Sequence, residues 1–174
     1  MRDELIKYYE NSRAHYTAYH NHKELSAWAG LVLFVFISGF INLIKLPDNH
    51  KIETAVILTF FVITISFLVY RYISNQLVMK DLGGAYAAAA VSFITDFVAQ
   101  RIEDNELSKY LEVEELPETH AQSKLVLPIR YIKKAEILNT RARGFQDTTR
   151  TMIYGLLLSV TIIVLASKWL QAIG

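Results

Sequence analysis

Three stretches of the chain are uncharged and almost entirely apolar, and segments rich in charged residues separate them. The stretches cover residues 26–44, 54–70 and 151–167, which are 19, 17 and 17 residues long. A helix rises about 1.5 Å per residue, so each stretch would extend roughly 26–29 Å, close to the thickness of a bilayer core. A helix in a soluble bundle keeps one polar face, whereas these stretches are apolar on every side. The pattern therefore predicts three membrane-spanning helices.

The composition agrees with a membrane protein. Of the 174 residues, 52% are hydrophobic, and the mean hydropathy is +0.23, which is high for a soluble domain of this size. The net charge is only +1 and cysteine is absent, so the sequence predicts neither a nucleic-acid-binding surface nor a disulfide framework. The first stretch begins only after 25 residues and is longer than the apolar part of a signal peptide, so we expect it to stay in the mature chain.

The distribution of Lys and Arg predicts how the spans are oriented. Four of these residues precede the first stretch, two lie between the first and second, eleven lie between the second and third, and one follows the third. Because basic residues accumulate on the cytoplasmic side, we expect the N-terminus and the long middle segment in the cytoplasm. This predicts a multi-pass membrane protein whose C-terminus lies on the side of the membrane opposite the cytoplasm.

The expected fold is an all-α integral membrane protein with three transmembrane helices and a helical cytoplasmic segment between the second and third. Residues 1–25 would form a cytoplasmic interfacial helix, 26–70 a transmembrane helical hairpin, 71–150 a cytoplasmic helical region, and 151–170 the third transmembrane helix. Aromatic rings near the first span are expected at the level of the lipid headgroups. These rings belong to Tyr8, Tyr9, Tyr16, Tyr19 and Trp28.

Two further predictions concern the helices of the middle segment. The second helix is expected to continue past Tyr70 and to stop at Gly83–Gly84, because glycine commonly ends helices. After a loop around Pro117, a helix is expected to begin near Ile129 and to continue without a strong break into the third stretch. The small residues Ala87–Ala90 would permit close helix contact, either inside the chain or between copies.

Six basic residues gather ahead of the third stretch, and the first five of them are candidate contacts: Arg130, Lys133, Lys134, Arg141, Arg143 and Arg150. One interpretation is ordinary anchoring at the cytoplasmic side together with pairing to the acidic segment at 103–118. The other is a site for an anionic ligand or lipid, such as a nucleotide second messenger or a phosphoinositide-like headgroup. The sequence holds no glycine-rich phosphate-binding loop of a known spacing.

Small and weakly polar residues recur in two of the spans. They are Thr151, Gly155 and Ser159 in the third span, and Ser26, Gly30, Ser38 and Asn42 in the first. In lipid, small residues let helix backbones approach closely and gain packing contacts. Three interpretations remain open for these positions. They could form seams inside the chain, seams between copies of a homo-oligomer, or the lining of an oligomeric pore.

The sequence predicts no catalytic, metal-binding or cofactor-binding residues. His15, Tyr19 and His22 share one helix face, but no HExxH or carboxylate–histidine pattern accompanies them. No Ser-His-Asp arrangement has a recognisable context, and the three stretches contain no ionisable side chain for chemistry inside the membrane. We therefore expect a protein that is not an enzyme, that contacts membrane lipids, and that binds no nucleic acid directly.

The layout of residues 8–71 invites a comparison with a known class. An aromatic, arginine-bearing helix, YYENSRAHYTAYHNHKE, leads into two hydrophobic helices joined by a short loop. This layout resembles the SLATT-type and other two-transmembrane effectors of bacterial antiphage defence. The resemblance covers about 65 residues. It implies a protein that oligomerises and permeabilises the inner membrane when a partner senses infection. The third stretch departs from the two-helix plan, and no functional residue is carried over.

Two hypotheses about function follow. The first is an inner-membrane protein that oligomerises and permeabilises or depolarises the membrane when triggered, as an abortive-infection effector. A cytoplasmic sensor protein or a nucleotide signal would then be its trigger. The alternative is a non-conducting membrane anchor or adaptor that recruits a cytoplasmic partner. Growth arrest with loss of membrane potential on induction would distinguish the first from the second.

Overall fold

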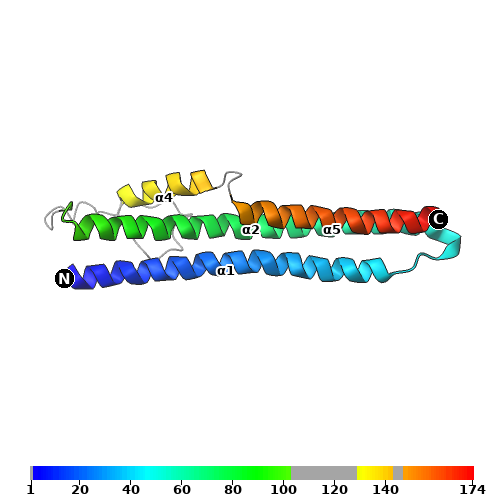
Figure 1. The fold of residues 1–174 in the computed structure, drawn as a ribbon, viewed down its shortest axis with the longest axis horizontal. Helices are drawn as coiled ribbons and strands as arrows, with labels where there is room; N and C mark the ends of the chain where they lie inside the picture. Colours follow the sequence, from blue (N-terminus) through cyan, green and yellow to red (C-terminus); the bar gives the residue numbers. More distant parts are fainter. Residues whose placement is uncertain (1, 103–128, 143–146) are drawn as a thin grey trace. The chain divides into compact units, whose positions relative to one another are not determined.

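The computed structural model describes residues 2–102, 129–142 and 147–174, and the elements in this part of the chain are all helical (Figure 1). They are α1 (Arg2–Leu43), the single 3-10 turn η1 (Asp48–His50), α2 (Lys51–Val98), α4 (Ile129–Ala142) and α5 (Thr148–Ile173). The predicted all-α class is confirmed. Three of these helices, α1, α2 and α5, are long and apolar enough to cross a membrane, as the three uncharged stretches predicted.

The chain forms two compact units, and α1 and α2 contribute residues to both. Met1–His22 and Met79–Gly144 make up one unit, here called the aromatic unit. Lys23–Val78 and Phe145–Gly174 make up the other, here called the apolar unit. The aromatic unit contains nearly the same residues as the two segments that the distribution of basic residues assigns to the cytoplasm. The apolar unit contains the three predicted spans.

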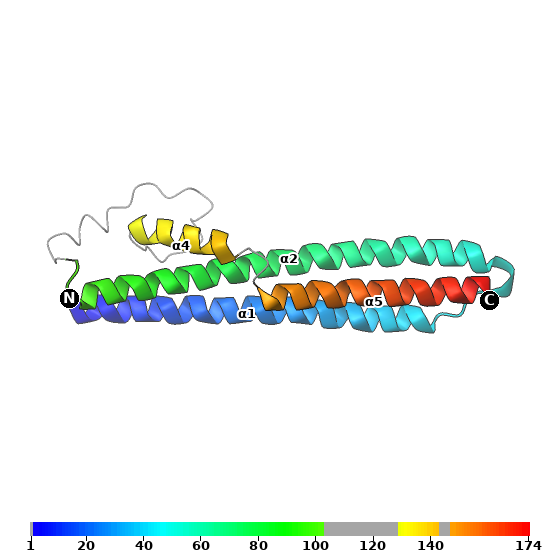
Figure 2. The same ribbon diagram turned by 45° about the horizontal axis from the view of Figure 1, so that its top comes forward.

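In the apolar unit, parts of α1 and α2 lie side by side with α5 (Figure 2). A cluster of buried side chains draws members from all three helices, namely Ala27, Leu31, Phe34, Ile73, Leu77, Ile153 and Leu157. A second cluster joins Ile41, Val62 and Val164. Each helix therefore buries one side against the other two, which is the arrangement of a three-helix bundle.

The outer surface of the apolar unit carries large apolar side chains on every helix. They include Phe40 on α1 and Phe60 on α2, both 71% exposed, and Ile163 on α5, 63% exposed. Soluble monomers rarely expose contiguous apolar surface of this extent, because its hydration is unfavourable. Hydrocarbon is the solvent that suits such a surface.

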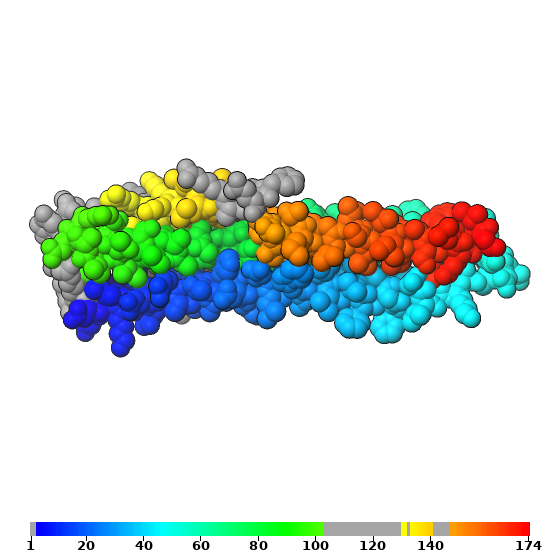
Figure 3. Space-filling model, in the orientation of Figure 1, coloured from blue at the N-terminus to red at the C-terminus, as the bar shows by residue number. Residues whose placement is uncertain are grey.

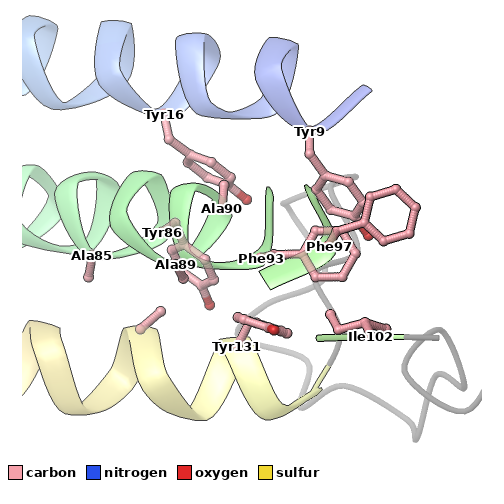
Figure 4. Packing of buried hydrophobic residues seen from close by; sticks show 11 residues of the cluster. Tyr9, Tyr16, Ala85, Tyr86, Ala89, Ala90, Phe93, Phe97, Ile102 and Tyr131 are labelled. Carbon is pink, nitrogen blue, oxygen red and sulfur yellow. The ribbon is translucent and has the colours of Figure 1, made fainter. Parts of the chain in front are cut away.

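The aromatic unit is held by rings from three helices (Figure 4). Tyr9 of α1 packs on Phe93 of α2 with ring centroids 4.2 Å apart. Phe93 in turn meets Tyr131 of α4 edge to face at 5.2 Å. Tyr16 of α1 stacks on Tyr86 of α2 at 5.1 Å. Offset and edge-on ring pairs of this kind add to the free energy of burial, so they fix α4 against the pair formed by α1 and α2.

The prediction that the second helix stops at Gly83–Gly84 is wrong. α2 continues through both glycines to Val98, and neither has a positive φ. A Cβ at Gly83 would lie 3.0 Å from the ring of Tyr19 and 3.3 Å from the backbone nitrogen of His20. The glycines therefore allow α1 and α2 to approach closely. In a sequence, a glycine that admits a neighbouring helix looks the same as a glycine that ends a helix.

α2 ends at Val98, and two residues later Gln100 adopts a left-handed backbone conformation with φ of 55°. The backbone nitrogens of Gln100 and Arg101 donate to the carbonyls of Phe97 and Asp96, at 3.2 Å and 2.9 Å. This is a Schellman pattern, which usually places glycine at the left-handed position. Glutamine there gives no sequence signal, so the true end of the helix was not predicted.

The expected continuous helix from Ile129 into the third stretch is also interrupted. α4 ends at Ala142, and α5 begins at Thr148 after Asp147, whose backbone is extended. The Asp147 carboxylate accepts a hydrogen bond from the Arg150 backbone nitrogen at 3.4 Å. Aspartate at this position accepts a hydrogen bond from a backbone N–H that the first turn of a helix leaves unpaired. Asp147 is therefore the N-cap of a separate helix, α5.

The predicted aromatic belt is wrong for two of its five members. Tyr9 and Tyr16 are buried in the core of the aromatic unit, because their rings face α2 and pack on Phe93 and Tyr86. Their spacing of seven residues places them on one face of α1. That face is therefore a core face rather than a surface at the lipid headgroups.

Candidate functional site

One row of predicted seam residues lies on the outer face of α5. Thr151, Gly155 and Ser159, here called the α5 stripe, are all exposed, and a Cβ built at Gly155 meets nothing within 4 Å. The Ser159 hydroxyl donates to the Gly155 carbonyl of its own helix at 2.8 Å. α5 instead packs inward through other residues, which are Ile153, Leu157, Val164, Lys168 and Ala172. Among the described residues, the packing of the chain thus leaves the stripe open, and Figure 3 shows α5 forming part of the visible surface.

The predicted seam residues of the first span have mixed positions. Gly30 is half-buried, and a Cβ there would lie 3.0 Å from the ring of Tyr72, so this glycine serves the contact between α1 and α2. Ser26 is also half-buried. Ser38 is buried, and its hydroxyl has no hydrogen-bond partner among the described residues. Asn42 is exposed. These four residues therefore do not form a single outward row like the α5 stripe.

Lys168 makes buried polar contacts between helices that the sequence did not reveal. Its side chain is only 1% exposed, and its ammonium donates to the backbone carbonyls of Asn42 and Ile44 at 2.9 Å and 2.6 Å. A third bond, at 3.2 Å, goes to the side chain of Gln171. Carbonyls at the end of a helix have no partner within the helix and carry a partial negative charge. The Lys168 ammonium donates hydrogen bonds to these carbonyls and balances their partial negative charge, and it thereby connects the end of α1 to α5.

Hydroxyl contacts join α2 and α5 inside the apolar unit. Ser66 and Thr161 lie 2.9 Å apart, and the indole nitrogen of Trp169 donates to the Thr59 hydroxyl at 3.1 Å. Such contacts stabilise helix pairs in lipid because few other polar partners exist there. They show how α5 is fixed in rotation, which is why its stripe faces outward.

The basic residues predicted as ligand or lipid contacts fall largely on α4. Arg130, Lys133 and Lys134 are exposed on this helix. Arg141 belongs to its last turn, and Arg143 lies outside the described residues. The three exposed residues share one side of α4, since they lie at spacings of three and four. The opposite side faces the core.

A polar contact completes the docking of α4. The Tyr131 hydroxyl donates to the Asp96 carboxylate at 2.9 Å, and Arg101 contacts the other carboxylate oxygen at 3.2 Å. Tyr131 is almost fully buried, whereas the side chain of Arg101 is well exposed. The bond from Tyr131 is therefore the stronger anchor, because the exposed ion pair is screened by water.

The histidines of α1 do not gather into a metal site. Within the described residues there is no group of three or more His, Cys, Asp or Glu that could hold an ion. Instead, the Nδ1 atom of His20 lies 2.9 Å from the Lys80 carbonyl of α2. A Cβ at Gly84 would lie 3.0 Å from the same nitrogen. His20 therefore acts as a packing residue in the contact that the two glycines make possible.

No protein-family model, curated protein or solved structure matches this chain. The packing of the two units and the chemistry of their exposed surfaces are the features of the molecule that bear on its function.

Proposed function

We propose that this chain is a bacterial inner-membrane protein that self-associates through the outer face of α5 and permeabilises or depolarises the membrane when triggered. Its N-terminus and aromatic unit would lie in the cytoplasm, where a sensor protein or a nucleotide signal could act on them. The role would be that of an abortive-infection effector, which the layout of residues 8–71 also favours.

The observation that carries the proposal is the division of α5 into two faces. The inner face is fixed by burial and by Lys168, while the α5 stripe of small residues is left open. Bulky apolar side chains elsewhere on the bundle suit lipid, but small residues gain little from contact with fluid lipid chains. They gain more from the backbone of another helix, which can approach them closely.

The tightly packed interior of the apolar unit also supports self-association. The interior of the apolar unit is filled by side chains such as Ala27, Ile73 and Ile153, each fully buried. Interiors packed in this way have no room for a hydrated solute. A conducting path would therefore have to be built between copies, and the hydroxyls of Thr151 and Ser159 are weakly polar groups that could line it.

The test is induction of the chain in bacterial cells with a dye that reports the membrane potential. The proposal expects depolarisation and growth arrest, and it expects Gly155→Leu to remove both. Gly39→Leu is the matched control, because Gly39 is also exposed with open space around its Cβ position, but lies on α1. Depolarisation that survives Gly155→Leu, or that both variants abolish equally, would contradict the proposal.

A different surface, on the C-terminal part of α2, favours the alternative function of an adaptor. The exposed positions of α2 between Leu82 and Val98 are uncharged, and they lie at spacings of three and four: Ala88, Val91, Thr95 and Val98. Such a row is typical of a helix that packs against another helix. An adaptor would keep the membrane potential intact on induction and would lose its partner when Val91 is changed to Glu.

A further inference from the structure

α4 has two chemically distinct sides. Tyr131 and Ala135 are buried against the core of the aromatic unit. On another side, Arg130, Lys133 and Lys134 are exposed, and Ile137 lies on the same side with 55% of its surface exposed. These four residues occupy positions i, i+3, i+4 and i+7, so they form one continuous face. We call it the basic face of α4.

The basic face is not used by the packing that the structure describes. Neither Arg130 nor Lys133 makes an ion pair within residues 2–102, 129–142 and 147–174. Lys134 is exposed, and it adds a small share to the lowered pKa of the Asp96 carboxyl, which the hydrogen bond from Tyr131 lowers most. The single acidic residue of α4, Glu136, is exposed beside this face. Counted over the described residues, the face therefore carries a net positive charge.

The short segment between α4 and α5 also limits how far apart these two helices can lie. Only residues 143–147 separate the end of α4 from the start of α5. Five residues reach at most about 18 Å when fully extended. Along the chain, α4 is therefore tethered by a short segment to α5, which is a candidate membrane span.

We propose that the basic face of α4 binds the surface of a bilayer that contains anionic phospholipid. This inference rests on the membrane insertion included in the proposed function. Lys and Arg stems lie along an apolar surface while their charged ends reach the phosphates. Ile137 at the C-terminal end of the face would enter the boundary between headgroups and acyl chains, as in other interfacial amphipathic helices.

The geometry favours a lipid surface over a single soluble anion. A phosphate held by one protein site needs several donors that converge on it. The cations of α4 instead lie along about one turn of a helix, and an exposed isoleucine follows them one turn later on the same face. A plane of headgroups presents many separate phosphates together with apolar material, and this matches both features.

The experiment uses the full chain, which contains no cysteine, so that a single introduced thiol can be labelled. Ile137→Cys carries an environment-sensitive fluorophore, and the protein is reconstituted into vesicles of phosphatidylcholine alone or with phosphatidylglycerol in both leaflets. We expect emission at shorter wavelength in the anionic vesicles and loss of that shift at high salt, where charges are screened within about 3 Å. The same label at Thr17, an exposed position on α1, should report no difference.

Two charge variants decide whether the basic face is responsible. Arg130→Gln with Lys133→Gln should abolish the shift, whereas Lys7→Gln with Arg13→Gln should leave it intact, since Lys7 and Arg13 are exposed on α1 of the same unit. An unchanged shift in the α4 variant would overturn the proposal. So would equal emission in both vesicles, or a shift that inorganic phosphate produces in neutral vesicles, which would indicate a soluble anion.

Extraction with alkaline carbonate distinguishes a failure of lipid binding by α4 from a failure of membrane insertion. Protein that resists extraction but shows no response to anionic lipid contradicts only the role of α4. Protein that alkaline carbonate removes from the vesicles contradicts membrane insertion, and the proposal for α4 fails with it.

Discussion

At the scale of single residues, the least expected finding is the buried ammonium of Lys168. In the sequence this lysine looks like a flanking charge that follows an apolar stretch. Its burial depends on where α1 ends in space, because its partners are the carbonyls of Asn42 and Ile44, more than 120 residues earlier. No local pattern carries that information, so the contact could not be predicted from the sequence.

Replacing Lys168 by Met should destabilise the apolar unit. The volume is nearly kept, but two backbone carbonyls lose a charged donor, at a cost of about 2 kcal/mol. For a chain of this length we expect the midpoint of thermal unfolding in detergent to fall by about 4–8 °C. Lys51→Met is the control, because Lys51 makes only an exposed pair with Asp48 at 3.6 Å. Equal midpoints for the two variants would show that the Lys168 bonds contribute nothing.

Tyr131 provides a second test at the same scale. Phe at this position keeps the ring contact with Phe93 but removes the donor to Asp96. A hydrogen bond to a charged group contributes about 1.5–3 kcal/mol, so the amides of α4 should exchange with solvent at least about tenfold faster. Hydrogen exchange read by mass spectrometry measures this directly. Tyr8→Phe, which removes an exposed hydroxyl from α1, should leave α4 unchanged.

At the scale of the helices, the sequence predicted the three long apolar helices well and the helix ends poorly. The spans were recognisable because a run without charge is a local property. Gly83 and Gly84 were misread because glycine serves two purposes, ending a helix or admitting a neighbour, and only the position of α1 decides between them. The start of α5 did carry a local signal in Asp147, but the helical periodicity around it obscured the break.

The role of Gly83 can be tested by enlarging it. Gly83→Leu would place atoms within 3.3 Å of the backbone of α1, so we expect a loss of about 1–3 kcal/mol despite the better helix propensity of leucine. Gly39→Leu, in open space, should be neutral or slightly stabilising. Thermal unfolding of both variants in the same detergent compares them. A Gly83→Leu protein as stable as wild type would mean that α1 and α2 do not approach closely there.

At the scale of the whole molecule, the two units differ in the solvent that their surfaces suit. The apolar unit exposes phenylalanine and aliphatic side chains on all three helices. The aromatic unit buries rings such as those of Tyr9, Phe93 and Tyr131, and it exposes charged residues on α1 and α4. The sequence predicted the positions of the small residues but not their direction. The structure separates Gly30, which serves the chain's own packing, from the α5 stripe, which the described chain leaves open.

The most direct measurement of the central claim is cross-linking between copies in native membranes. A single cysteine is introduced at Ser159 within the α5 stripe, or at Gly39 on α1 as the control, and the membranes are treated with a short thiol-specific linker. Copies inserted in one direction hold residue 159 at one depth, so a contact through the stripe brings the two thiols together. We predict a cross-linked dimer for Ser159→Cys, its loss when Gly155→Leu is added, and only monomer for Gly39→Cys. Monomeric Ser159→Cys beside a cross-linked Gly39→Cys would contradict the proposed self-association through α5.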